Sequence, residues 1–387
     1  MRTQVGIVGA GPAGLLLSHL LQLLGIDSVV VERRSREYVE KRVRAGVLEQ
    51  GTVDLLNETG VGERLRREGL VHRGIELLLD GQAHRIPLSD LTGGRAITIY
   101  GQQKVVRDLT DARLAAGGQL YFEADDVRAD PAAPAIHFTV AGRDVALDCD
   151  VIAGCDGFHG VCRDALPAAQ RRIHEREYPF GWLGILAEVA PSTDELIYAY
   201  HPRGFALHSL RSPEISRLYL QVDPHEDIAS WPDARIWDEL QVRLARDGWT
   251  LKEGPILEKA ITPMRSFVCE TMRHDRLFLA GDAAHIVPPT GAKGLNLAVH
   301  DVYVLAEALA DWYRGGRRTL LDAYSATCLR RVWRVQHFSW WMTSMLHRFP
   351  GTDSFAERLQ RAQLEYVASS PAAATTLAEN YVGLPWS

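Results

Sequence analysis

Three glycines near the N-terminus have a spacing suited to binding a phosphate. Gly9, Gly11 and Gly14 follow an apolar run at residues 5–8 and precede a leucine-rich segment. In a strand-turn-helix unit, the first two glycines permit a tight turn and close approach of the backbone to a pyrophosphate, and the third lets the helix pack on the strand. The amides and the dipole at the helix N-terminus attract phosphate. The spacing therefore predicts a dinucleotide site, with a ligand-free strand, turn and helix as the alternative.

A carboxylate follows the next apolar run. Glu32 closes the run at residues 28–31, about eighteen residues after Gly14. An acidic side chain at this position can accept both hydroxyls of an adenosine ribose. It suits an unphosphorylated ribose, so FAD or NAD is favoured over NADP at this site.

Two hydroxyl side chains flank guanidinium groups in the middle of the chain. Ser209, Arg211, Arg217 and Tyr219 lie within a predicted β region. The planar fork of an arginine forms strong, directional bonds to a carboxylate, and the hydroxyls add donors. The pattern favours recognition of a carboxylate-bearing ligand, and an ion pair at the rim of a cleft is the alternative.

A stretch rich in arginine follows Glu32, between residues 33 and 44. Arg33, Arg34, Tyr38 and Arg42 could surround a ribose phosphate with positive charge and an aromatic face. Solvated charges on a helix are the alternative.

Further along, Asp282 ends a buried strand, where its side chain can reach a ligand hydroxyl. A helix N-cap is the alternative role for this residue.

These side chains require a mixed arrangement of strands and helices. A strand at 5–8, a helix at 12–24 and a strand at 28–32 form the first unit, and an apolar strand at 150–155 returns to the same sheet. Short β-rich runs dominate residues 178–263, with one helix near 234–246. A last buried strand at 276–280 precedes a helix at 295–313 and a largely helical tail with an aromatic cluster, which is core or a dimer contact.

The predicted fold class is α/β with several domains. A doubly wound, Rossmann-like FAD domain covers residues 1–177 and is completed by 276–312. A β-sheet substrate domain covers 178–275, and a helical C-terminal interface region covers 313–387.

Composition excludes several functions. The 43 basic and 49 acidic residues give a net charge of −6, without a basic tail or stripe, so nucleic acid is not an expected partner. No segment has the length and apolarity of a membrane span, so no membrane partner is expected. The five cysteines form no metal-ligand pattern, and their odd number argues against a disulfide framework. We expect no metal and a reducing cytoplasm.

Three motifs occur in the order found in a known enzyme family. The glycine-rich turn is followed by Cys155-Asp156-Gly157 and by Gly281-Asp282-Ala283-Ala284-His285. Longer matching segments lie at residues 44–51, 201–207, 279–297 and 380–385. Over its whole length the chain resembles the single-component FAD-dependent aromatic hydroxylases, especially those that act on 4-hydroxybenzoate.

The resemblance implies non-covalently bound FAD and assigns further residues to it. Asp282 matches an aspartate that binds a ribityl hydroxyl, and Arg44 and Gln102 match positions that hold the pyrophosphate and ribityl chain. Asp156 matches a residue between the FAD and nicotinamide sides. Other matches close to the flavin are Arg217, Lys293 and Asn296. The lysine adds positive potential that favours reduced, anionic flavin.

The resemblance also assigns both ends of the substrate. Ser209, Arg211 and Tyr219 match residues that bind the benzoate carboxylate. At the phenol end, Tyr198 and Tyr381 match a pair that relays the phenol proton, with His72 at the solvent end. The Pro289 carbonyl and Thr290 match groups that touch the substrate hydroxyl and ring.

The implied reaction converts 4-hydroxybenzoate to 3,4-dihydroxybenzoate with NADPH and dioxygen, through a flavin hydroperoxide. Tyr38 and Arg42 match positions linked to NADPH use, and a homodimer is expected. The same chemistry on an aminobenzoate or a dihydroxybenzoate is one alternative. A flavin electron-transfer or sensor protein that inserts no oxygen is another.

Three residues depart from the family pattern. Tyr200, His208 and Leu210 are interleaved with the substrate segment. From strand alternation we expect all three to face away from the pocket, altering packing or redox tuning while substrate choice stays intact.

Overall fold

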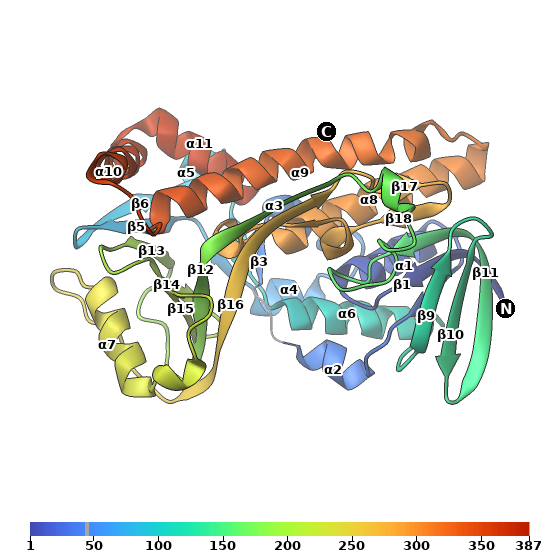
Figure 1. Cartoon of the computed structure of the whole chain (residues 1–387), viewed down its shortest axis with the longest axis horizontal. Helices are drawn as coiled ribbons and strands as arrows, with labels where there is room; N and C mark the ends of the chain where they lie inside the picture. Colours follow the sequence, from blue (N-terminus) through green and yellow to red (C-terminus); the bar gives the residue numbers. More distant parts are fainter. Residues whose placement is uncertain (43–45, 387) are drawn as a thin grey trace.

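The computed structural model describes residues 1–42 and 46–386. Arg44, expected near the FAD pyrophosphate, lies outside the described residues. Two large sheets and a layer of long helices make up the described chain (Figure 1).

The first sheet is built around a parallel core. Val5 of the central strand pairs with Val151 on one side and with Ser28 on the other. The strand order is β17-β18-β11-β1-β2-β8, and β10 and β9 extend it by antiparallel pairing from β11. The return of the strand ending at Gly154 to this sheet is confirmed. Its strands are β1 (Arg2–Val8), β2 (Ser28–Val31), β8 (Gln119–Tyr121), β9 (Asp125–Asp130), β10 (Ala135–Val140), β11 (Arg143–Gly154), β17 (Arg273–His274) and β18 (Leu277–Leu279).

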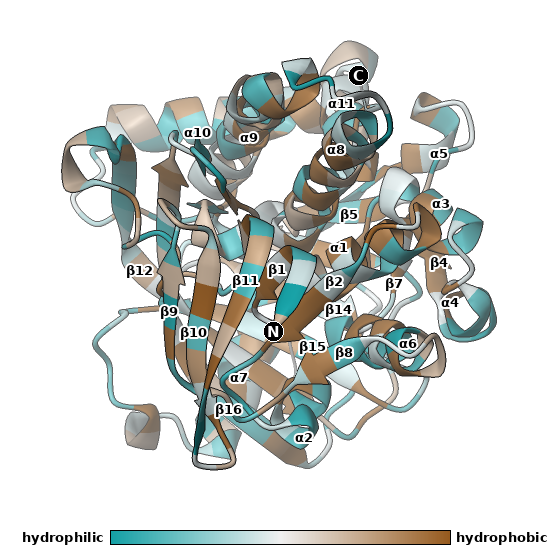
Figure 2. Ribbon diagram, turned by 90° about the vertical axis from the view of Figure 1, so that its right-hand side faces the viewer, coloured by the Kyte–Doolittle hydropathy of each residue, from teal (hydrophilic) through white to brown (hydrophobic). Residues whose placement is uncertain are grey.

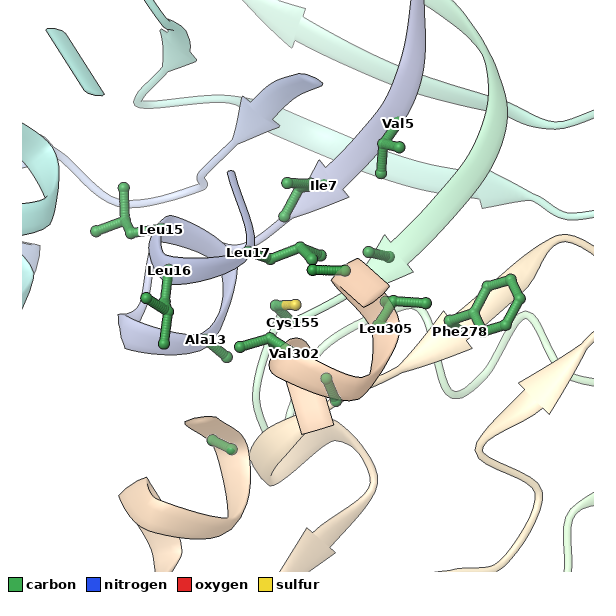
Figure 3. Close-up of a cluster of buried hydrophobic side chains, with 14 of the residues drawn as sticks. Val5, Ile7, Ala13, Leu15, Leu16, Leu17, Cys155, Phe278, Val302 and Leu305 are labelled. Atoms are coloured by element: carbon green, nitrogen blue, oxygen red, sulfur yellow. The ribbon is translucent and has the colours of Figure 1, made fainter. Parts of the chain in front are cut away.

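Helices cover the apolar face of this sheet. The helix expected at 12–24 is α1 (Pro12–Leu23), which packs on α6 (Gln102–Ala115) and α8 (Gly294–Gly315). Figure 3 shows Val302 and Leu305 of α8 close to Leu17 of α1 and Ile7 of β1, all fully buried or nearly so. Burial on both faces explains why β1 and β2 end in continuous apolar runs at residues 5–8 and 29–31 (Figure 2). Smaller helices nearby are α2 (Arg36–Lys41), α3 (Gln50–Glu58) and α4 (Glu63–Glu68).

The second sheet is mainly antiparallel. Its order is β19-β16-β12-β15-β14-β13-β5-β6, and only the β13–β5 pairing is parallel. Its strands are β5 (Ile75–Leu79), β6 (Gln82–Ile86), β12 (Ile173–Ala187), β13 (Leu196–Tyr200), β14 (Ala206–Leu210), β15 (Ser216–Val222), β16 (Ile256–Cys269) and β19 (His285–Ile286). The helix α7 (Asp233–Arg243) covers one face. A small third sheet consists of β3 (Val47–Leu48), β7 (Ile97–Ile99) and β4 (Leu70–His72).

The C-terminal region is helical, as expected. The long helix α9 (Thr319–Leu346) runs along one side of the molecule and reaches α10 (Ser354–Ser369) and α11 (Pro371–Val382) at its C-terminal end (Figure 1). α11 packs on α5 (Leu88–Leu91). No described helix is long and apolar enough to cross a membrane. Short 3₁₀ turns are η1 (Ala168–Gln170), η2 (Ile228–Ser230), η3 (Gly281–Ala283) and η4 (Pro289–Gly291).

All five cysteines are free and buried. This agrees with the expectation that they form no disulfide framework.

Candidate active site

The three glycines of the first turn have different physical roles. Gly9 has φ +104°, and a Cβ there would lie 2.4 Å from the carbonyl oxygen of Cys155. A Cβ on Gly14 would lie 2.0 Å from the Gly9 carbonyl oxygen, so only glycine lets the helix approach the turn. A Cβ on Gly11 would meet nothing within 4 Å. The turn is closely packed behind Gly9 and Gly14 and open at Gly11, as an approaching pyrophosphate requires.

Glu32 joins the end of β2 to this turn. Its carboxylate accepts hydrogen bonds from the backbone N–H groups of Ala10 at 2.8 Å and Arg34 at 2.7 Å. Each carboxylate oxygen can accept more than one bond, so these contacts leave capacity for ribose hydroxyls. The side chain therefore remains suited to the predicted role.

Asp282 lies in a short loop whose two ends contact the buried Asp301. Its side chain is exposed and, among the described residues, accepts no hydrogen bond, while η3 receives no side-chain cap. The N-cap alternative is therefore not what the structure shows. The buried Asp301 accepts from the Gly281 N–H at 2.9 Å and contacts His285 Nε2 at 2.6 Å. Asp301 thus fixes both ends of the loop that presents Asp282.

Lys293 is buried beside two groups that sequence reasoning missed. Its ammonium donates to Glu49 Oε1 and to the Tyr381 carbonyl, each at 2.8 Å. Arg331 donates to the other oxygen of Glu49 at 2.6 Å. Burial lowers the pKa of Lys293, and the Glu49 carboxylate opposes that effect. The single carboxylate of Glu49 thus forms ion pairs with two buried cations, Lys293 and Arg331, which leaves a local excess of positive charge.

Asn296 holds the elements around that network. Its Oδ1 accepts from the backbone N–H of Glu49 at 2.9 Å and from the Thr52 hydroxyl at 2.8 Å. Its Nδ2 donates to the carbonyls of Val47 and Ala292. These contacts tie β3 and α3 to α8, and they occupy both donor hydrogens of the amide.

Gln102 and Asp156 lie at the ends of elements that border the first sheet. Gln102 is partly buried and is the first residue of α6. Asp156 follows β11, accepts from the backbone N–H of Cys162 at 2.9 Å and has a second, buried oxygen without a partner among the described residues. Burial raises the pKa of Asp156.

One face of the second sheet carries the predicted substrate residues. Ser209 of β14 pairs directly with Arg217 of β15, and Leu207 pairs with both Tyr198 and Tyr219. Paired residues on adjacent strands share a face, so Tyr198, Ser209, Arg217 and Tyr219 point to the same side. The register therefore unites the predicted carboxylate end with the predicted phenol end.

The guanidinium groups on this face have few protein partners. Arg211 is partly buried just beyond β14, and its Nη2 donates to Gln103 Oε1 at 2.5 Å. Burial lowers the pKa of Arg211. The Nε of Arg217 donates to the Tyr219 hydroxyl at 3.3 Å, while its buried Nη1 has no partner among the described residues. Ser209 donates to the Arg217 carbonyl at 2.9 Å.

Tyr198 and Tyr381 form a buried hydroxyl pair. Their oxygens lie 2.5 Å apart, and both side chains are about 1% exposed. Burial raises the pKa of each tyrosine above its ordinary value. Both are therefore neutral near pH 7, and because one hydroxyl donates to the other, the second has a hydrogen free for a different acceptor.

His72 differs from the expectation. We expected it at the solvent end of a relay, but the side chain is 2% exposed in β4, and neither ring nitrogen has a partner among the described residues. Burial lowers its pKa to about 4. Its strand pairs with β7 in the third sheet, and the charges of Glu195 and Asp194 oppose the effect of burial on its pKa.

Pro289 and Thr290 lie in η4, close to α9. Pro289 is exposed, whereas Thr290 is fully buried and its hydroxyl lies 2.8 Å from that of Thr343.

The arginine segment forms a compact exposed group: the guanidinium carbons of Arg34 and Arg42 lie 5.2 and 5.9 Å from the centroid of the Tyr38 ring. Arg33 is exposed next to them.

The expected orientation of Tyr200 is wrong. Strand alternation separates neighbours, so Tyr200 shares the face of Tyr198, two residues earlier, and joins the same hydrophobic cluster. His208 lies on the opposite face, opposite Ile197 and Leu218, and accepts from the Ser192 N–H at 3.1 Å. Leu210 alternates in the same way as His208.

Comparisons with known proteins agree with the predicted resemblance. The profile of the FAD binding domain family matches residues 2–339. The p-hydroxybenzoate hydroxylase of Acinetobacter baylyi is 51% identical to the chain, covering 100% of it and 96% of the relative. A dialkyldecalin synthase of Streptomyces rugosporus is 26% identical, covering 84% of this chain and 69% of the relative. The crystal structure of p-nitrophenol 4-monooxygenase from Pseudomonas putida DLL-E4 superposes with a TM-score of 0.85 at 18% identity and covers 99% of both chains.

Proposed function

The chain belongs to the FAD binding domain family, and from this premise we propose that it hydroxylates 4-hydroxybenzoate to 3,4-dihydroxybenzoate with NADPH and dioxygen. It is a flavoprotein monooxygenase of the aromatic hydroxylase type. The observation that carries the substrate assignment is the single sheet face with carboxylate-binding groups at one end and the buried Tyr198–Tyr381 pair at the other.

FAD fits the first turn and the loops beside it. We assign Gly11 to the pyrophosphate, Glu32 to the ribose and Asp282 to a ribityl hydroxyl. The open space at Gly11, the hydrogen bond from Glu32 to the turn and the exposure of Asp282 support these assignments. Gln102, Asp156 and Asn296 border the same region, and we assign Arg44 to the pyrophosphate by family resemblance. When bound, FAD supplies hydride acceptance and the activation of dioxygen.

We assign the benzoate carboxylate to Arg211, Ser209 and Tyr219. To donate to it, the Ser209 hydroxyl turns its single hydrogen away from the Arg217 carbonyl. A guanidinium with one side-chain partner retains donors for two parallel bonds to a carboxylate. The pairing of Arg217 with Tyr219 keeps a second positive charge near this end. We assign Arg217 to the flavin side by family resemblance. Orientation is the contribution of these groups, because a fixed ring presents one carbon for attack.

The phenol end is activated by proton removal. The Tyr198 hydroxyl accepts the phenol hydrogen bond, and the Tyr198–Tyr381 contact offers the proton a path away from the ring. The excess positive charge of Lys293 and Arg331 against Glu49 favours an anion nearby. The Pro289 carbonyl and Thr290 border the ring. His72, being buried, takes part only through an intervening group.

The hydroxyl pair also favours a phenol over other rings. A buried O–H···O–H contact can accept from a phenol and then pass its proton onward, whereas an aminobenzoate offers a much less acidic N–H. An aminobenzoate or a dihydroxybenzoate remains the competing substrate class.

NADPH docks on the arginine segment. The guanidinium groups of Arg34 and Arg42 both lie close to the Tyr38 ring, and Arg33 is next to Arg34 in sequence. This arrangement offers charge for a 2′-phosphate and an aromatic face for a base.

We further propose a homodimer in the cytoplasm, with the three-part domain division described above. The exposed Phe355, Leu359 and Tyr366 on α10, together with Trp333 and Trp340 on α9, supply apolar surface for a second copy. The free cysteines suit a reducing compartment.

Product analysis tests the proposed reaction. The purified holoenzyme is first reduced anaerobically by NADPH in the presence of 4-hydroxybenzoate or an aminobenzoate, and oxygen is then admitted. Formation of one 3,4-dihydroxybenzoate per NADPH supports the proposal. Hydrogen peroxide without a hydroxylated product contradicts it, and hydroxylation of only the aminobenzoate reassigns the substrate.

A further inference from the structure

A buried histidine at the end of α9 contacts Trp182, which packs against the proposed substrate residue Tyr219. His347 is fully buried, and its Nε2 lies 2.7 Å from the indole nitrogen of Trp182 on β12. An indole N–H can only donate, so Nε2 must be the acceptor. The other ring nitrogen, Nδ1, lies 3.0 Å from the Thr343 carbonyl and therefore donates to it. Both hydrogen bonds fix one neutral form of the imidazole, and burial lowers its pKa to about 3.

Trp182 connects this histidine with the carboxylate end of the pocket. Its ring centroid lies 4.7 Å from that of Tyr219, on the same face of the sheet. Tyr219 in turn contacts the guanidinium of Arg217. The position of the Tyr219 hydroxyl therefore depends on the Trp182 ring. His347 fixes this ring through the indole nitrogen, the only polar side-chain atom of Trp182.

The stack around His347 extends to the phenol end. The imidazole lies 4.3 Å from the centroid of Phe205 and 4.8 Å from that of Phe180, and Phe205 lies 6.1 Å from Tyr198.

One turn earlier in α9, the hydroxyl of Thr343 donates to the Ser339 carbonyl at 2.7 Å. Its only hydrogen is thus committed, so in the contact with Thr290 it must accept.

We propose that His347 is a positioning residue for the substrate carboxylate: by accepting the Trp182 hydrogen bond, it fixes the indole ring against which Tyr219 is set. This inference rests on the proposed function, because it concerns the affinity for 4-hydroxybenzoate. The hydrogen bond itself does not depend on the identity of the substrate.

Substitutions of both partners separate positioning from general packing. His347→Phe retains an aromatic ring but leaves the buried indole N–H without an acceptor, and we expect the Kd for 4-hydroxybenzoate, measured by flavin absorbance, to rise about tenfold. His347→Gln restores an acceptor, and we expect it to recover most of the affinity. In a Trp182→Phe background, His347→Phe should have no further effect, because no donor remains. A rise of equal size in both backgrounds, or none in the native background, overturns the proposal.

A second measurement requires neither ligand nor a His347 variant. In protein labelled with ¹⁵N-tryptophan, the Trp182 indole signal is identified by its absence from Trp182→Phe. We expect a strongly downfield proton that exchanges slowly with solvent. A shift typical of a water-exposed indole overturns the proposal even if His347→Phe does not fold. Absence of 4-hydroxybenzoate binding by the unmodified holoenzyme instead contradicts the proposed function, while the indole signal still decides the hydrogen bond.

Discussion

Replacing Glu49 by Gln tests the charge arrangement beside the site. Glu49 is the shared partner of Lys293 and Arg331, and the three side chains are 1–9% exposed. Glutamine has nearly the same shape and can still accept one hydrogen bond, but it carries no charge. The variant therefore leaves two buried cations close together without compensation.

The expected loss follows from that burial. Breaking a buried ion pair by removing one partner costs about 3–5 kcal/mol of unfolding free energy. With about 2.1 cal/mol/K of unfolding entropy per residue over 387 residues, this loss corresponds to a fall in Tm of about 4–6 °C. Glu37→Gln is the matched control, because Glu37 forms an exposed pair with Lys41. Solvent screens an exposed ion pair, so its removal should hardly change Tm.

The deficit of the variant should depend on pH. Burial already lowers the pKa of Lys293, and Glu49 is the main opposing influence, so the substitution lowers that pKa further. Between the folded and the unfolded pKa the unfolded chain binds more protons, and stability therefore rises with pH. In Glu49→Gln this rise begins at lower pH than in the unmodified protein. The difference in unfolding free energy should shrink as the pH is raised from neutral into the alkaline range.

Thermal unfolding of the FAD-saturated proteins across this pH range is the assay. Saturation with FAD keeps cofactor binding from masking the intrinsic difference. If Glu49→Gln has the same Tm as Glu37→Gln, the buried network of Glu49, Lys293 and Arg331 contributes nothing to stability. A deficit that stays constant with pH would mean that Lys293 does not sense the Glu49 charge.

Three further predictions concern the ligands. Arg211→Ala should weaken 4-hydroxybenzoate binding by about 2–5 kcal/mol, with partial recovery in Arg211→Lys; an unchanged Kd in a flavin absorbance titration contradicts the assignment. Tyr198→Phe should oxidise NADPH while releasing mostly peroxide, and Tyr381→Phe should show a milder loss because it is one step further along the relay; full product yield from Tyr198→Phe would mean that the proton leaves by another route. Changing Tyr38 to Glu together with Arg42 to Thr should lower the preference for NADPH over NADH by repelling the 2′-phosphate; equal kcat/KM values for both coenzymes in the unmodified enzyme would refute the phosphate-site argument.

Local patterns predicted the parts of the fold in which neighbours in sequence determine the structure. The glycine turn, α1 and β2 follow from apolar periodicity and from Gly9 and Gly14, where the backbone leaves no room for a Cβ. The strand ending at Gly154 was recognisable because burial on both faces leaves an apolar run.

Contacts between distant segments left weaker signals. Glu49 lies 244 residues from Lys293, and the only local sign of burial is that it follows Val47 and Leu48 directly. The hairpin of β5 and β6 belongs to the second sheet, although it precedes that sheet's other strands by about a hundred residues. The surroundings of the buried His72 include the charges of Asp194 and Glu195, which are far from it in sequence, so no pattern around His72 reveals them.

The placement of β18 has a consequence for the order of folding during synthesis. β18 pairs in parallel with β11, but α7 and strands β12 to β16, which form most of the second sheet, lie between the two in sequence. The first sheet therefore stays incomplete on the ribosome until residue 279 of 387 has been made, and the loop bearing Asp282 follows immediately. Contacts this far apart in sequence form slowly, because the intervening chain must first be ordered. The glycine turn, made within the first fourteen residues, thus belongs to a sheet that is completed only after most of the chain has been made.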